Sequence, residues 1–468
     1  MADAPPDTPA TKPASGQLDT LVDAPPRVRT DSAATQRWLG AKNLLADGVE
    51  QGSRVVERSQ RSLTRRVFSV LGTLTGRDDL VRPLEQALWF GFAASHSNVR
   101  LVSRLTSIAL DALAELADPA LPGHTETPIA LRSDIIGTQP WLWDGFVAVV
   151  NGVVGDHLAA TQNPLAVTMA LRLGDTYATP SEVAAALASQ PAPLKLAVYV
   201  HGLTATEWSW ALDAQQQHGA PDATYASLLQ RDAGFVPVLV RYNSGLHISD
   251  NGQQLHAQLQ ALVTAMPGRD MELALIGHSM GGLVAHSAVH YAGQAPQPTW
   301  LASLRHVITL GTPHEGAPLE RFGRLVEEVL GAIDTPGTRI PADVMGARSA
   351  GIKDLRHGYL VAEDWRDADA GIKRPRTVNR RVAGVQYHRV VGTITADPDH
   401  PVGRWVGDTM VRPSSAAASA AASQERPDEV TRIGGVSHVG LSNDARVFSY
   451  LRAWLGAAGE GTCTPSAP

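Results

Sequence analysis

The stretch "LALIGHSMGGLVAHSAV", Leu273 to Val289, places a serine between glycines at the point where an apolar run changes into a helical pattern. The apolar run before Gly277 is typical of a buried strand, and the spacing of apolar residues after Gly281 is typical of a helix. A Gly-x-Ser-x-Gly pattern in this setting predicts a sharp turn that presents the Ser279 hydroxyl above the edge of a sheet. Both glycines are expected because the strand and helix backbones approach closely there.

The chain around this turn alternates short apolar runs with longer helical stretches. This alternation is the pattern of repeated β-α units, and it predicts an α/β fold with a mostly parallel sheet flanked by helices. The apolar runs begin at Leu194, Phe235, Met271, His306 and Tyr387.

A serine hydroxyl is a weak nucleophile at neutral pH, so it needs a histidine base and a carboxylate that orients the base. When the serine lies at a sheet edge, the chain order is serine, acid, histidine. His438 lies between a Gly-rich stretch and an amphipathic helix pattern, which makes it the candidate base. Asp408 is the favoured acid because Gly407 opens a tight loop after a predicted strand, whereas Asp397 and Asp399 lie in a plain polar turn.

Acyl transfer also requires two backbone amides that stabilise the oxyanion of the tetrahedral intermediate. The N–H of Met280, directly after the serine, is one candidate, and the N–H of Leu203 is the other because "VYVHGL" turns at the end of a predicted strand. Trp208 and Trp210 follow this turn, and two interpretations are open for them: they line an acyl pocket, or they pack beneath a lid.

Changes in composition divide the chain. Residues 1–28 and 457–468 are rich in small and polar residues, and we expect both to be disordered. Residues 29–190 carry apolar side chains at three- and four-residue spacings, which predicts a helical N-terminal region. Residues 191–456 form the predicted catalytic domain, in which the insertion 317–385 is long enough to predict a lid or cap.

Composition also excludes several classes of protein. With 468 residues, 44% of them hydrophobic, the chain can bury a sizeable core, and its net charge of −6 argues against a nucleic-acid binder. The irregular spacing of Asp397, Asp399, His400 and Asp408 does not favour a metal site, and the serine chemistry needs no cofactor. The N-terminus lacks a signal-peptide pattern and no run is suited to span a bilayer, so we expect a soluble, cytoplasmic protein.

Four arginines form a basic stripe on a predicted N-terminal helix, and two interpretations are open for it. Arg54, Arg58, Arg61 and Arg65 fall on one face of a predicted helix. A solvated helix face is the favoured interpretation, and a weak contact with an anionic membrane surface through the N-terminal helices is the alternative.

Five stretches together resemble the α/β-hydrolase superfamily, and within it bacterial lipase/esterase-like proteins and relatives that deacylate lipid anchors. They are "VYVHGL", "LIGHSMGGLVAH", "ITLGTPHEGAP", "GDTMV" and "SHVGLSND", in the order of the family, between about Leu194 and Leu455. The resemblance implies the α/β-hydrolase fold, with Ser279 as nucleophile, Asp408 as acid and His438 as base.

The resemblance also implies that "GTPHEGAP" borders the active site and leads into a lid, which makes His314 a candidate for substrate binding beside Trp208. The stretch "RYNSGLHISDNGQ", residues 241–253, resembles a loop of uncharacterised bacterial members of the family.

These observations predict a serine carboxylic-ester hydrolase that cleaves lipid or small-molecule esters with apolar acyl groups through an acyl-enzyme on Ser279. One rival is an acyltransferase that uses the same three residues and passes the acyl group to an alcohol, because the outcome depends on access of water to the acyl-enzyme. The other rival is a catalytically silent hydrolase-fold protein that binds partners through its N-terminal helices.

Overall fold

The structure is a computed structural model, and it describes residues 139–296, 300–317, 349–371, 375, 377, 381–417 and 429–456. The expectations for residues 1–138, including the arginine stripe, and for the C-terminal tail lie outside the described residues. No helix within the described ranges is long and apolar enough to cross a membrane.

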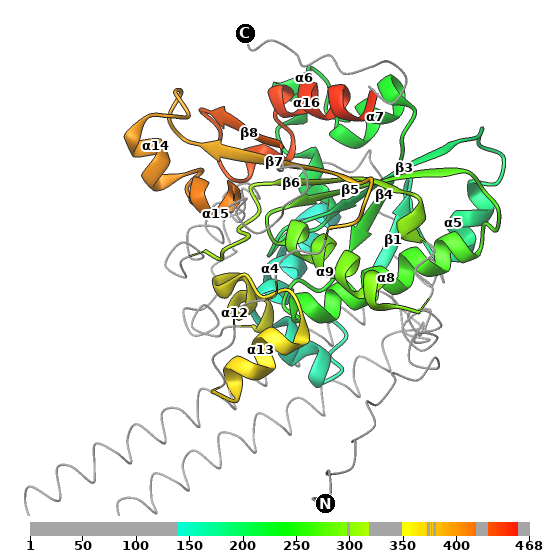
Figure 1. The fold of residues 1–468 in the computed structure, drawn as a ribbon, viewed down its shortest axis with the longest axis horizontal. Coiled ribbons are helices and arrows are strands. Elements are labelled where there is room, and N and C mark those ends of the chain that lie inside the picture. The colour runs from blue at the N-terminus through cyan, green and yellow to red at the C-terminus, as the bar shows by residue number, and fades with distance from the viewer. Residues whose placement is uncertain are drawn as a thin grey trace, which may run out of the picture.

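An eight-stranded sheet forms the centre of the described chain, with strand order β2-β1-β4-β3-β5-β6-β7-β8 (Figure 1). The pairs from β4-β3 through β7-β8 are all parallel, whereas β1 is antiparallel to both β2 and β4. The strands are β1 (Ala170–Leu173), β2 (Thr176–Ala178), β3 (Leu194–Val200), β4 (Val236–Arg241), β5 (Met271–His278), β6 (Leu304–Leu310), β7 (Gln386–Thr393) and β8 (Glu429–Gly434). The predicted fold class is therefore confirmed.

Helices cover both faces of the sheet. The α-helices are α4 (Gln139–Ala160), α5 (Pro180–Ala186), α6 (Ala214–His218), α7 (Tyr225–Ala233), α8 (Ile248–Thr264), α9 (Met280–Gln294), α12 (Ala350–His357), α13 (Ala362–Asp369), α14 (Pro401–Val406), α15 (Pro413–Ala417) and α16 (Ala445–Gly456). The short 3₁₀ helices are η3 (Glu207–Ala211), η4 (Trp300–Ala302) and η7 (Gly440–Ser442).

Two hydrophobic cores result from the alternation of side chains along the strands. On β3, Leu196 and Val198 pack in one core with side chains of α8 and α9. Their neighbours Ala197 and Tyr199 point to the opposite face, in a second core with side chains of α7 and α16. Helices α7 and α16 lie together on one side of the sheet, and α8 and α9 lie on the other (Figure 1). Because the central strands are buried on both faces, they appear in the sequence as continuous apolar runs.

The five apolar runs of the sequence correspond to β3, β4, β5, β6 and β7, and these predictions are confirmed. The expectation that residues 29–190 are wholly helical is wrong for residues 170–178, which form β1 and β2 and extend the same sheet. These strands have only 4 and 3 residues, too few to show a clear period. The sheet therefore continues across the boundary expected at residue 190.

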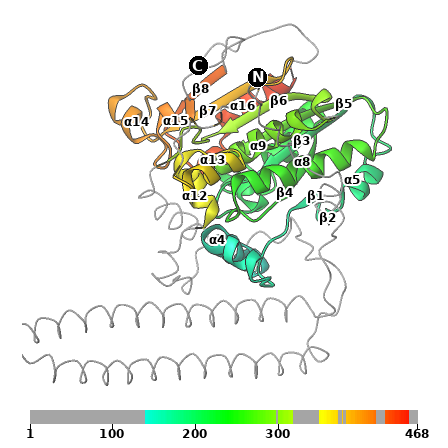
Figure 2. The same ribbon diagram turned by 60° about the horizontal axis from the view of Figure 1, so that its bottom comes forward.

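Two described helices, α12 and α13, come from the insertion predicted as a lid. Helix α12 contacts α4 and α8, so this helix of the insertion lies against the domain near the helix that precedes the sheet (Figure 2). Its function as a lid remains a proposal.

Candidate active site

Ser279 occupies the turn between β5 and α9. Its backbone angles, φ 52° and ψ −123°, are rare for a residue with a side chain, and such strain persists only where the surrounding structure enforces it. A Cβ atom added to Gly277 would lie 2.5 Å from the Gly282 Cα, and one added to Gly281 would overlap the Val200 carbonyl oxygen. The expected steric role of both glycines is confirmed.

Three side chains that are distant in sequence form one hydrogen-bonded line. The Ser279 Oγ lies 2.8 Å from the His438 Nε2, and the His438 Nδ1 lies 2.8 Å from the Asp408 Oδ2. The three residues are only 1–4% exposed. A neutral imidazole can donate through Nδ1 to the carboxylate while its Nε2 accepts the serine proton, so this line can deprotonate the hydroxyl.

The Asp408 loop is built to fix its carboxylate. The second oxygen, Oδ1, accepts hydrogen bonds from the amides of Met410 and Val411, at 3.0 and 2.8 Å. Gly407 has φ 75°, and a Cβ there would overlap the Val411 carbonyl oxygen. The glycine before Asp408 therefore permits the tight turn that orients the acid.

The alternative aspartates lie elsewhere. The carboxylate of Asp397 accepts a hydrogen bond from the Asp399 amide at 2.9 Å, and Asp399 pairs with Arg432 at 2.8 Å on an exposed surface. These contacts are those of a polar turn. The described residues contain no group of histidine, cysteine, aspartate or glutamate side chains that could hold a metal ion.

The two candidate oxyanion amides come from segments that meet beside Ser279. Met280 is the first residue of α9, where an N–H has no partner within the helix. Leu203 follows β3, and the adjacent turn lies close to the serine, because a Cβ added to Gly202 would lie 3.1 Å from the Ser279 Cβ.

Two buried histidines support these segments. The His278 Nε2 donates to the His438 carbonyl oxygen at 2.8 Å, and burial lowers the pKa of His278 to about 3, so its ring is neutral. The His201 Nδ1 donates to the Gly202 carbonyl oxygen at 2.9 Å, and burial lowers the pKa of His201 to about 4. Both histidines therefore serve as neutral hydrogen-bonding groups.

The candidate substrate-binding residues, Trp208 and His314, contact other side chains of the protein. The Arg172 guanidinium lies 4.8 Å from the ring centre of Trp208, and the His314 Nε2 lies 3.3 Å from the Thr309 Oγ1. Both side chains are buried, and burial lowers the pKa of His314 well below its ordinary value. Their role in binding substrate stays a prediction.

Two contacts at the site were not predicted from the sequence. The Leu310 carbonyl oxygen accepts a hydrogen bond from the Ser279 amide at 2.8 Å. A Cβ added to Gly311 would lie 3.1 Å from the Asp408 Oδ2 and 3.2 Å from the His438 Cε1. The glycine directly after the β6 run was the available signal, because a glycine at the end of a parallel strand marks a close approach.

The family model for a PGAP1-like alpha/beta domain matches residues 218–410. No curated protein matches the sequence. Among solved structures, the mature lipase BlEst2 of Bacillus licheniformis is 20% identical; the alignment covers 57% of this chain and 94% of the lipase, with a TM-score of 0.36. The phospholipase PlaB of Legionella pneumophila is 16% identical, with 56% of each chain covered and a TM-score of 0.34.

A putative esterase from Staphylococcus aureus is also similar, with 14% identity, 58% of this chain and 77% of the esterase covered, and a TM-score of 0.31. Likenesses at this level assign no activity. The mostly parallel sheet flanked by helices and the serine turn between β5 and α9 give the described residues an α/β-hydrolase fold, and residues 218–410 are similar to a PGAP1-like alpha/beta domain.

Proposed function

We propose that the chain is a serine hydrolase that cleaves carboxylic esters with apolar acyl groups. The observation that carries the proposal is the buried line of hydrogen bonds from Ser279 through His438 to Asp408. A serine in this arrangement is an activated nucleophile, and a carboxylic ester offers it a carbonyl carbon to attack.

In the proposed reaction the Ser279 Oγ attacks the ester carbonyl carbon while the His438 Nε2 takes the hydroxyl proton. The amides of Leu203 and Met280 donate to the oxyanion, and collapse of the tetrahedral intermediate breaks the bond to the alcohol, which leaves with the proton from His438. Water then attacks the acyl-enzyme, giving its proton to His438, which returns it to Ser279 as the acid departs. The Asp408 carboxylate stabilises the imidazolium in both halves.

The buried acid and base favour this proposal over a silent binding protein. Burying an aspartate and a histidine is costly unless both are paired, and here both ring nitrogens of His438 have a partner that suits catalysis. A scaffold protein would not need a strained serine at the other end of the line.

The test is labelling with a fluorophosphonate together with turnover of short p-nitrophenyl esters by the full chain. The unmodified chain should be labelled and active, whereas Ser279→Ala should lose both while keeping its unfolding temperature. Ser287→Ala is a matched control, because Ser287 is a buried serine on α9, directly downstream of Ser279, and its hydroxyl donates to the Leu360 carbonyl oxygen. Labelling that persists in Ser279→Ala would contradict the proposal.

Acyl transfer to an alcohol remains the rival reaction, and the products distinguish it from hydrolysis. With a medium-chain ester and an added short alcohol, a hydrolase releases mainly the free acid, whereas a transferase releases mainly the new ester. We propose hydrolysis as the principal outcome.

A further inference from the structure

The motif "RYNS" at Arg241–Ser244, which begins at the last residue of β4, has no part in the proposed reaction. Its side chains nevertheless contact the turn that carries the Leu203 amide. The Tyr242 hydroxyl donates to the His201 carbonyl oxygen at 2.7 Å, and the two rings stack with centroids 4.3 Å apart. This bond fixes the peptide group just before the one that contains the Leu203 N–H.

The next peptide group is fixed from the same motif. The Ser244 Oγ accepts a hydrogen bond from the Thr204 amide at 3.1 Å, and the Thr204 hydroxyl donates to the Leu203 carbonyl oxygen at 2.7 Å. Thr204 has φ 57°, a conformation that is strained for a β-branched residue. The peptide groups on both sides of the Leu203 N–H are therefore tied to Tyr242 and Ser244.

A buried cluster of charged side chains holds η3, the segment that follows the turn. The Arg241 Nε donates to the Glu207 Oε2 at 2.9 Å, and its Nη2 donates to the Asp144 Oδ2 at 3.3 Å. The Tyr177 hydroxyl donates to the other Glu207 oxygen. Because all four groups are paired, the start of η3 is held against the end of β4.

Helix α4 contacts the motif through Asn243. The Asn243 Nδ2 donates to the Gly155 carbonyl oxygen at 2.9 Å, and a Cβ added to Gly155 would overlap the Asn243 side chain. A Cβ added to Gly152 would lie 2.5 Å from the Thr204 Cγ2. Helix α4 thus contacts both the motif and the turn.

We propose that Tyr242 and Ser244 are positioning residues that orient the Leu203 amide toward the oxyanion. The inference rests on the proposed function, because the amide matters only if an oxyanion forms beside Ser279. The motif acts through the backbone of residues 201–204.

The experiment measures turnover of an acetyl ester and inhibition by a short-chain trifluoromethyl ketone in the full chain. The ketone forms a hemiketal whose oxyanion would accept from the same amides, so its affinity reports the transition-state contact. Ser244→Ala and Tyr242→Phe should each lower kcat about tenfold, since losing an oxyanion donor outright costs about 10² to 10³. The inhibition constant should rise by the same factor while KM stays within about twofold.

Two controls separate positioning from general damage. Ser244→Thr keeps the hydroxyl and should restore most of kcat. Ser249→Ala removes an equally buried hydroxyl, which accepts from the Trp365 Nε1 at 3.1 Å, and should leave acetyl-ester turnover within about twofold.

Unchanged kcat in folded Ser244→Ala and Tyr242→Phe would overturn the inference, as would a fall in kcat without loss of ketone affinity. Failure of the proposed function appears differently: the unmodified chain would then lack turnover that depends on Ser279.

Discussion

Ser279 shows how single residues combine to make the candidate site. Its strained backbone costs about 1–3 kcal/mol, which the surrounding structure offsets. The Ser279 amide donates to Leu310, and the Ser279 carbonyl oxygen accepts from Gly282 at 3.1 Å. The strain thus lies where the hydroxyl must be held rigidly toward His438.

The three proposed catalytic residues could be predicted because each has a local signal. Ser279 lies between glycines, Asp408 follows Gly407, and His438 follows a Gly-rich stretch. The supporting residues have no such signal, because the contacts of Tyr242 and Ser244 join segments that lie 40 or 41 positions apart in sequence.

Replacing the acid tests the choice among three aspartates. Asp408→Asn should lower kcat by about 10³- to 10⁴-fold, because an amide no longer holds the imidazole in the productive tautomer. Asp397→Asn and Asp399→Asn should each stay within about twofold, since both lie in the exposed turn. Steady-state turnover of an acetyl ester measures all three, and a large loss at Asp399 would reverse the assignment.

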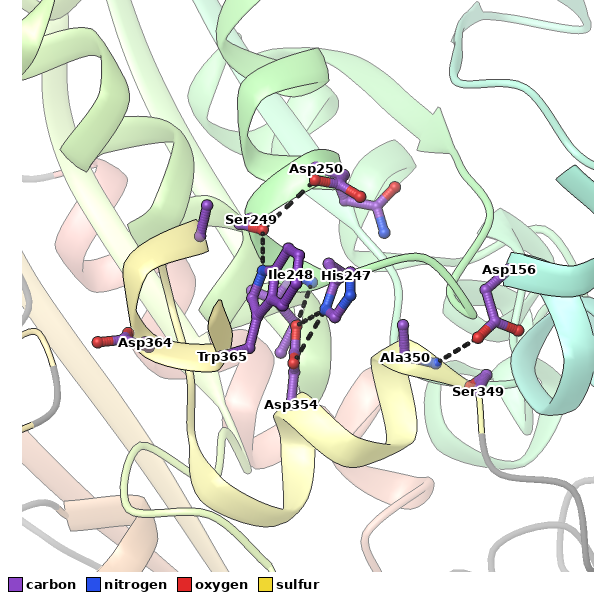
Figure 3. A network of polar contacts seen from close by, with 12 residues as sticks. Asp156, His247, Ile248, Ser249, Asp250, Ser349, Ala350, Asp354, Asp364 and Trp365 are labelled. Atoms are coloured by element: carbon purple, nitrogen blue, oxygen red, sulfur yellow. Dashed lines mark hydrogen bonds and ion pairs between the residues drawn. The ribbon is translucent and has the colours of Figure 1, made fainter. Parts of the chain in front are cut away.

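At the scale of elements, helices α12 and α13 of the insertion are anchored by a cap contact formed by His247, Ile248, Ser249, Asp354 and Trp365 (Figure 3). The Asp354 Oδ2 accepts from the His247 Nδ1 at 3.0 Å and from the Ile248 amide at 2.9 Å, so α12 supplies a cap for the first turn of α8. The rings of His247 and Trp365 stack with centroids 3.9 Å apart.

The stability that the cap contact contributes to the fold should depend on pH. Burial disfavours the charged imidazolium, but the hydrogen bond and charge of Asp354 outweigh it, with smaller contributions from Asp250 and Asp156, so the pKa of His247 is raised above 6.5. Burial raises the pKa of Asp354, and His247 opposes that shift. The stabilisation by His247 is therefore present below pH 6.5 and is lost as the pH rises through its raised value.

Thermal unfolding of the full chain at several pH values measures this dependence. His247→Gln should lower the unfolding temperature more at about pH 6 than at about pH 9. Ser249→Ala removes an uncharged hydrogen-bonding group of the same cap contact, so it is the control and should lower the unfolding temperature equally at both pH values. An equal loss by His247→Gln at both pH values would contradict the ion pair.

Loosening the same contact tests the insertion as a lid. Trp365→Ala removes both the stack on His247 and the hydrogen bond to Ser249. If α13 helps to close over an acyl chain, the ratio of decanoyl-ester to acetyl-ester turnover should change by about fivefold or more. The reason is that each methylene of the decanoyl chain that is no longer buried loses about 0.8 kcal/mol of binding free energy. An unchanged ratio in a folded variant would make the insertion a structural element only.

The strands that the sequence did not predict are those whose position depends on pairing with neighbouring strands. Strand β8 alternates exposed and buried positions only over residues 430–433, and it lies at the edge of the sheet beside β7. Strands β1 and β2 are short, and they take their place in the sheet because β1 pairs with β4 and β2 pairs with β1. The long central strands were evident because burial on both faces makes them continuously apolar.

At the scale of the whole molecule, residues 139–190 belong to the hydrolase unit. Leu171 of β1 is fully buried in the core beside α8 and α9, opposite Val240 of β4. Helix α4 contacts Thr204 through Gly152 and Asn243 through Gly155. The sequence pattern suggested that this segment packs, but its direct contact with the oxyanion turn arises only from the tertiary structure.

Two truncated chains test this assignment. A chain that begins at residue 191 would lack α4, β1, β2 and α5, which leaves β4 as an unpaired edge and exposes the apolar face that Leu171 covers. We expect it to aggregate, and any soluble fraction to retain less than about a tenth of the acetyl-ester kcat, because Thr204 and Asn243 lose their support from α4. A chain that begins at residue 135 keeps these contacts and should match the full chain in kcat. Light scattering after size exclusion and turnover per labelled serine measure both effects. A soluble, fully active chain from residue 191 would show that residues 139–190 are an independent addition to the hydrolase domain.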